Sequence, residues 1–137
     1  MGNFDFVRQT LPSVYGECER AESYLISDPR SACFYSRRVV ELVVDYLYQV
    51  LSLRTPYRDD LSAKINDSAF KTQVPPTITQ KLNAIRRIAN TAVHDNRQIG
   101  RDASLAVLRG AERATAWPTS RRPCRCRACR CRRPARA

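Results

Sequence analysis

The sequence of 137 residues contains a single histidine and lacks any apolar run of transmembrane length. It also lacks a signal peptide with a basic start and an apolar middle, so we expect a cytoplasmic protein that has no membrane partner. The chain has no Walker A pattern, and this absence excludes ATP hydrolysis by the sequence as it stands. An acidic cluster able to hold Mg²⁺ is missing too. We therefore predict no cofactor and no metal ion.

Acidic residues are absent from residues 118–137, which hold eight of the 24 basic residues. The first 117 residues keep 16 basic groups against 13 acidic ones and carry only +3 of the net charge of +11. The strongly basic composition is therefore mostly a property of the C-terminal segment. We predict one folded domain over residues 1–117, large enough to bury its own core, and a disordered basic tail over residues 118–137.

Four of the six cysteines lie in that tail, in the order Cys124, Cys126, Cys129 and Cys131. Three interpretations stay open: four thiolate ligands for Zn²⁺, a basic arm that binds nucleic-acid phosphates, and an out-of-frame translation of GC-rich DNA. Structural zinc sites usually separate two cysteine pairs by a longer loop, which is absent here, and the out-of-frame origin is favoured. Cys18 and Cys33 sit among apolar neighbours, and we expect them to be buried free thiols.

No stretch of the sequence is convincing as a β-strand, so the predicted fold is an all-α bundle of about five helices. Four adjacent valines, Val39, Val40, Val43 and Val44, favour a strand locally, but their segment is too long for one. Asp28 before Pro29 is typical of a helix start, and Asp102 is a second expected N-cap. The helix after Pro29 is predicted to be the central, most buried one. The five predicted helices cover residues 11–26, 29–51, 61–70, 77–95 and 103–117.

The predicted helix over residues 77–95 has two faces. Its apolar residues recur at the three- and four-residue steps of a buried stripe. Asn83, Arg87, Asn90 and His94 recur in the same way on another side and form one polar row. Two amides and two groups that are able to carry positive charge suit a phosphate or a nucleotide. We therefore predict that this row, together with the adjacent Arg86, binds nucleic acid.

Simpler explanations exist for individual members of the row. His94 stands at the end of the predicted helix, where a protonated imidazole interacts favourably with the helix dipole. Arg87 is placed to form an ion pair with Glu41 or Asp45 of the central helix. Spacing alone favours these structural roles over a binding site.

The order of several separated motifs resembles a small helical domain at the N-terminus of type I restriction enzyme R subunits and related DEAD/DEAH-box helicases. The resemblance covers about residues 1–112. It is carried most clearly by the sequence from Arg86 to His94, which looks like the signature helix of that domain. The other matching segments are Phe4 and Phe6, Ala21–Tyr24, Ser27–Arg30, Phe34–Arg38 with Glu41 and Leu42, and Leu61–Ala63.

That domain in turn resembles the HEPN superfamily of helical bundles, whose hallmark is an arginine and a histidine separated by four to six residues on one helix. Arg87 and His94 match this spacing. In nuclease members two subunits line a shared cleft that cuts RNA without a metal. The resemblance then implies that His94 transfers a proton and Arg87 stabilises the charged phosphorane. Active members usually carry a polar residue after the arginine, where this chain has Ile88.

The sequence thus leads to two expectations about function. The first is a non-catalytic accessory or interaction domain of a restriction-type helicase subunit, which contacts nucleic acid or other parts of a restriction complex. In this interpretation the family-like sequence is cut short after about residue 112 by a truncation or frameshift. The alternative is a small, toxin-like HEPN ribonuclease, in which Arg87 and His94 are catalytic and a homodimer forms the cleft.

Overall fold

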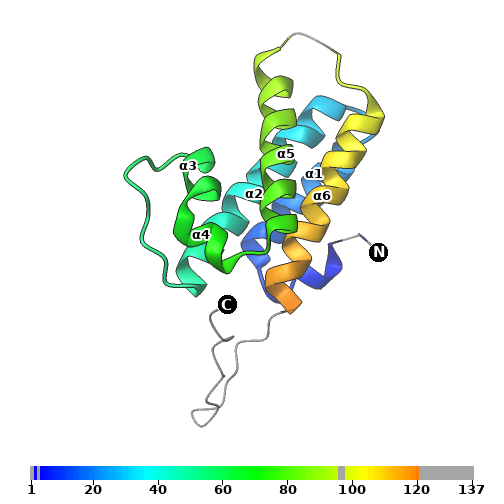
Figure 1. Cartoon of the computed structure of the whole chain (residues 1–137). Coiled ribbons are helices and arrows are strands. Elements are labelled where there is room, and N and C mark those ends of the chain that lie inside the picture. The colour runs from blue at the N-terminus through cyan, green and yellow to red at the C-terminus, as the bar shows by residue number, and fades with distance from the viewer. Residues whose placement is uncertain (1, 3, 96–97, 121–137) are drawn as a thin grey trace.

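The computed structural model describes residues 2, 4–95 and 98–120 and confirms an all-α fold. The helices of the described residues are a short 3-10 helix, η1, and six α-helices, and no strand occurs among them. Figure 1 shows four long helices, α1, α2, α5 and α6, packed together, with the short α3 and α4 at one side. Their bounds are η1 Asp5–Val7, α1 Pro12–Tyr24, α2 Pro29–Val50, α3 Leu61–Asn66, α4 Ser68–Gln73, α5 Pro76–His94 and α6 Arg101–Ser120.

Helix α2 is the centre of the bundle, as the sequence predicts. It packs against α1, α3, α5 and α6, and its valines Val39, Val40, Val43 and Val44 are at most 1% exposed. The strand preference of these β-branched residues is overridden because a helix buries all four against neighbouring helices. The predicted cap is present too, because the Asp28 side chain accepts a hydrogen bond from the backbone N–H of Ser31.

The C-terminal end of α2 is closed by two backbone hydrogen bonds. The N–H of Leu53 donates to the carbonyl of Tyr48 at 2.9 Å, and the N–H of Ser52 donates to the carbonyl of Gln49 at 3.2 Å. This pairing is a Schellman motif, which requires a left-handed residue just after the helix. That residue is Ser52, with φ of 52°, where glycine is the usual choice.

Replacing Ser52 by glycine is therefore expected to stabilise the protein. The left-handed backbone costs an L-residue about 1 kcal/mol or more, and glycine removes that cost while adding some freedom to the unfolded chain. We expect a net gain of about 0.5–1 kcal/mol in the free energy of unfolding. Urea denaturation followed by circular dichroism measures it, with Ser52→Ala as a control that keeps the strain. A midpoint for Ser52→Gly below that of Ser52→Ala would contradict the account.

Two of the predicted elements differ from the structure. The helix predicted over residues 61–70 is two helices, because Asp67 lies in extended backbone between α3 and α4. Its side chain accepts hydrogen bonds from the N–H groups of Ala69 and Phe70 and so starts α4 anew. The prediction that Asp102 is the N-cap of the last helix is also wrong, because α6 already begins at Arg101. Asp102 lies in the first helical turn, where its charge interacts favourably with the helix dipole.

Helix α6 continues to Ser120, three residues beyond the predicted domain boundary at residue 117. The remaining residues of the predicted tail, 121–137, lie outside the described residues, and with them the four clustered cysteines. The other two cysteines are buried free thiols, as predicted. Burial raises the pKa of Cys18 to about 12 and that of Cys33 to about 11, so both stay protonated at neutral pH. None of the helices in the described ranges is long and apolar enough to span a membrane.

Candidate functional site

The predicted polar row lies on α5, but its members differ in exposure. Arg87 and His94 are exposed, whereas Asn83, Arg86 and Asn90 are partly buried against neighbouring elements. His94 is the last residue of α5, as the sequence predicts. The row is therefore divided into side chains that reach solvent and side chains that face the rest of the bundle.

The two amides of the row join α5 to other helices. Asn83 donates to the amide oxygen of Asn66 on α3 at 3.2 Å and accepts from the amide nitrogen of Asn66 at 3.4 Å. The amide oxygen of Asn90 accepts a hydrogen bond from Nη1 of Arg37 on α2. Each amide is thus engaged across a helix contact, so Asn83 and Asn90 help to join α5 to α3 and α2.

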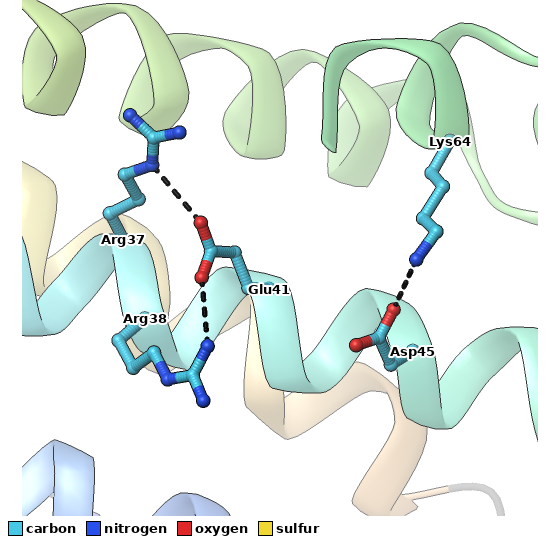
Figure 2. Close-up of polar contacts among 5 residues, drawn as sticks. All are labelled: Arg37, Arg38, Glu41, Asp45 and Lys64. Atoms are coloured by element: carbon cyan, nitrogen blue, oxygen red, sulfur yellow. Dashed lines mark hydrogen bonds and ion pairs between the residues drawn. The ribbon is translucent and has the colours of Figure 1, made fainter. Parts of the chain in front are cut away.

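Arg37 is the centre of an ion-pair network on α2 (Figure 2). Its Nε lies 3.2 Å from Oε1 of Glu41, and the other carboxylate oxygen lies 3.2 Å from Nη1 of Arg38. Glu41 is thus shared by two guanidinium groups, and the side chain of Arg37 points toward α5. The ion pair of Arg37 with Glu41 at one helical turn holds Arg37 in the conformation that reaches Asn90.

Arg87 does not form the predicted ion pair with Glu41 or Asp45, because other cations occupy both carboxylates. Lys64 on α3 lies 2.9 Å from Asp45, and Figure 2 shows this contact at the far end of the same face of α2. Within the described ranges, the guanidinium of Arg87 makes no hydrogen bond or ion pair. It remains a solvated positive charge one turn before Asn90.

Two hollows lie along this face of α2 and share Arg37, Arg38 and Glu41. The first, of about 320 Å³, extends toward α3 and is also lined by Asp45, Asp59, Asp60, Leu61 and Lys64. Its four carboxylates outnumber its three cations, so it does not favour an anion. Lys64 is held there between Asp59 at 2.6 Å and Asp45, and these two hydrogen-bonded carboxylates raise the pKa of its ammonium group.

The second hollow, also about 320 Å³, lies at the C-terminal end of α5. It is lined by Phe34, Arg37, Arg38, Glu41, Val93 and His94. The two arginines outweigh the one carboxylate, and the imidazole of His94 lines the same hollow. Of the two hollows, this one carries the excess of positive charge and is the one suited to a phosphate.

Phe34 gives the second hollow an exposed aromatic wall, because 51% of the residue is accessible to solvent. Its ring is set edge-on against Tyr35 with centroids 5.4 Å apart, and Tyr35 in turn stacks on Tyr24 at 5.5 Å. These ring contacts hold Phe34 in place although half of it faces water.

Arg86 was predicted to bind nucleic acid, but the structure places it partly inside the bundle. Its Nε atom is buried and has no hydrogen-bond partner in the described part of the chain. A buried donor without a partner costs about 1–3 kcal/mol, so this arginine is held by packing of the surrounding helices. Arg86 is therefore partly buried among the helices, whereas the neighbouring Arg87 is exposed to solvent.

Sequence reasoning did not select Phe34, Arg37 and Arg38 as site residues. The available signal is the family resemblance of the segment Phe34–Arg38. The sequence alone does not show which neighbouring helix Phe34, Arg37 and Arg38 face. Only the packing of α2 against α5 brings them to His94.

Comparison with known families adds one finding. A family model described as a domain of unknown function, DUF4145, matches residues 19–115, well over half of the chain. The match includes α2, α3, α5 and the residues that line both hollows. Comparisons with curated proteins and with solved structures found no match. The chain therefore belongs to the DUF4145 family.

Proposed function

We propose that this domain is a non-catalytic accessory module of a larger, cytoplasmic restriction-type helicase or translocase, and that it contacts nucleic acid. The contact surface would be formed by Phe34, Arg37, Arg38, Arg87 and His94, named here the α2–α5 face. The observation that carries the proposal is the second hollow, where Arg37 and Arg38 from one helix meet His94 from another.

The charges of this face suit the phosphate backbone of a nucleic acid. Arg38 keeps 52% of its side chain exposed although it touches Glu41, and Arg87 is exposed one turn from Asn90. Guanidinium groups bind phosphate oxygens through paired hydrogen bonds. The exposed ring of Phe34 offers a surface on which a base of a single strand can stack.

The arrangement around His94 supports contact rather than catalysis. A general acid or base needs a side chain whose orientation and tautomer are fixed by a partner. In the described part of the chain, the imidazole of His94 has no hydrogen-bond partner, and it is exposed at a helix end. Arg87 lies seven residues earlier, or about 10.5 Å along the helix axis, so the two groups do not meet without a second element.

The restriction-type parent protein is supported by the order of the sequence motifs, from the aromatic start near Phe4 to the segment Arg86–His94. Membership of DUF4145 leaves the function open, since the family is defined as a domain of unknown function. Partners in this proposal are other domains or subunits of the same complex.

The alternative, a HEPN-type ribonuclease, is favoured by one observation. Arg87 and His94 are both exposed on one side of α5, which a shared cleft between two copies would require. In that case the two residues are catalytic, and a homodimer is the active form.

One experiment tests both proposals on the full chain. Labelled single-stranded RNA and DNA are incubated with the wild type, Arg87→Ala and His94→Ala, with EDTA present, while binding and cleavage are followed together. We expect binding without cleavage and an affinity about tenfold lower for Arg87→Ala, the loss of one charge-assisted contact. RNA cleavage that requires both residues would establish the ribonuclease instead. If the folded wild type neither binds nor cleaves the oligonucleotides, both proposals are refuted.

A further inference from the structure

A third surface hollow, separate from the α2–α5 face, lies between α5 and α6. It measures about 290 Å³, and its positively charged residues are Lys81, Arg109 and Arg113. Every other lining residue is apolar or glycine, including Ala84, Ile88 and Ala106. The hollow is therefore an aliphatic groove with cations at its edge, named here the α5–α6 groove.

The groove exists because α6 presents small residues toward α5. Ala106 and Gly110 are one helical turn apart and leave space that a larger side chain would fill. Gly110 also lets the two helices approach, since a Cβ atom there would lie 3.1 Å from Cδ1 of Ile85. Ile85 and Val107 below are buried in the core, which gives the groove a fixed floor.

The charges of the groove are not neutralised within the domain. No carboxylate lines it, and over the described residues Lys81, Arg109 and Arg113 take part in no ion pair. The ion pairs of Arg20, Arg37, Arg38, Arg58 and Lys64 lie elsewhere, on α1, on α2 and around α3. Arg109 and Arg113 are also like charges at one turn, a mildly unfavourable arrangement. An acidic ligand would relieve this repulsion.

We propose that the α5–α6 groove binds an acidic amphipathic helix of a partner protein or domain. The apolar side of that helix would cover Ala84, Ile88 and Ala106, and its carboxylates would reach the three cations. A groove between two packed helices has the shape that receives a third helix. A nucleic acid fits less well, because no aromatic ring lines the groove for base stacking. This inference does not depend on the function of the α2–α5 face.

The test uses a fluorescent peptide of about 18 residues, long enough to form a helix, built from Glu, Ala and Leu with the leucines on one side. We expect saturable binding to the full chain, measured by anisotropy. Arg109→Glu with Arg113→Glu should weaken it at least tenfold, and Ala106→Trp should block it without a charge change. The matched charge reversal at Arg54 and Arg58, two exposed arginines between α2 and α3, should leave it unchanged.

Three results would overturn the proposal. The first is no binding of the peptide to the folded wild type. The second is equal binding of a peptide whose leucines are replaced by serine, since attraction would then be charge alone. The third is loss of oligonucleotide binding in the Arg109→Glu, Arg113→Glu variant with peptide binding retained, which would make the groove a nucleic-acid site. Circular dichroism of each variant shows that the fold is kept, as expected for exposed side chains.

Discussion

Replacing Phe70 with alanine is expected to lower the free energy of unfolding by about 3–5 kcal/mol, a large share of the roughly 5–15 kcal/mol typical of such domains. Phe70 is fully buried, and its ring stacks on Tyr48 of α2 with centroids 5.5 Å apart. It is the buried residue of α4, a helix of six residues that is too short to be stable alone. Its removal therefore leaves a cavity and detaches α4 from the bundle.

Urea denaturation followed by circular dichroism measures this effect. Phe6→Ala is the matched control, because Phe6 is 41% exposed and removing its ring should cost about 1.5 kcal/mol or less. If Phe70→Ala loses no more stability than Phe6→Ala, the packing of α4 on α2 described above is wrong.

The second large effect concerns the α2–α5 face. Replacing both Arg38 and Arg87 by glutamate is expected to lower the affinity for a single-stranded oligonucleotide on the order of 100-fold. Arg38 and Arg87 are exposed, and in the proposed complex each supplies one charge-assisted phosphate contact, which is worth about tenfold in affinity. The magnitude of the slope of log affinity against log salt should fall by about 1.4, since two phosphates of a single strand are no longer neutralised.

A control for the Arg38, Arg87 double variant distinguishes a local contact from a general effect of net charge. Arg54 and Arg58 are exposed arginines in the segment between α2 and α3, and their double reversal changes the net charge by the same amount. We expect that control to keep most of the affinity and of the salt slope. Equal losses in the two double variants would mean that binding depends on overall charge, and the α2–α5 face would have no special role.

The central helix could be predicted from sequence because local and global signals agree. Asp28 and Pro29 mark its start, and its length excludes a strand despite Val39, Val40, Val43 and Val44. The break at Asp67 could not be predicted in the same way. Aspartate in a helical pattern is compatible with an exposed helix position or with a cap, and only the extended backbone there decides between them.

The candidate site was predictable only in part. Periodicity placed Arg87 and His94 on one side of α5, and the structure exposes both. Periodicity does not tell whether a polar side chain meets solvent or another helix. The pattern therefore predicts a ligand-binding amide at Asn90 and does not reveal that its oxygen accepts a hydrogen bond from Arg37. That interhelical contact, and the hollow beside it, depend on how α2 and α5 cross, which no local pattern records.

Mapping of amide chemical shifts during titration with a single-stranded oligonucleotide of about 15 nucleotides tests the central claim most directly, since that length covers a typical single-strand site. The account predicts that the largest shifts lie at Phe34, Arg37, Arg38, Arg87 and His94, around the hollow that joins α2 to the end of α5. Shifts confined to Lys81, Arg109 and Arg113 in the α5–α6 groove, or no shifts at all, would contradict it.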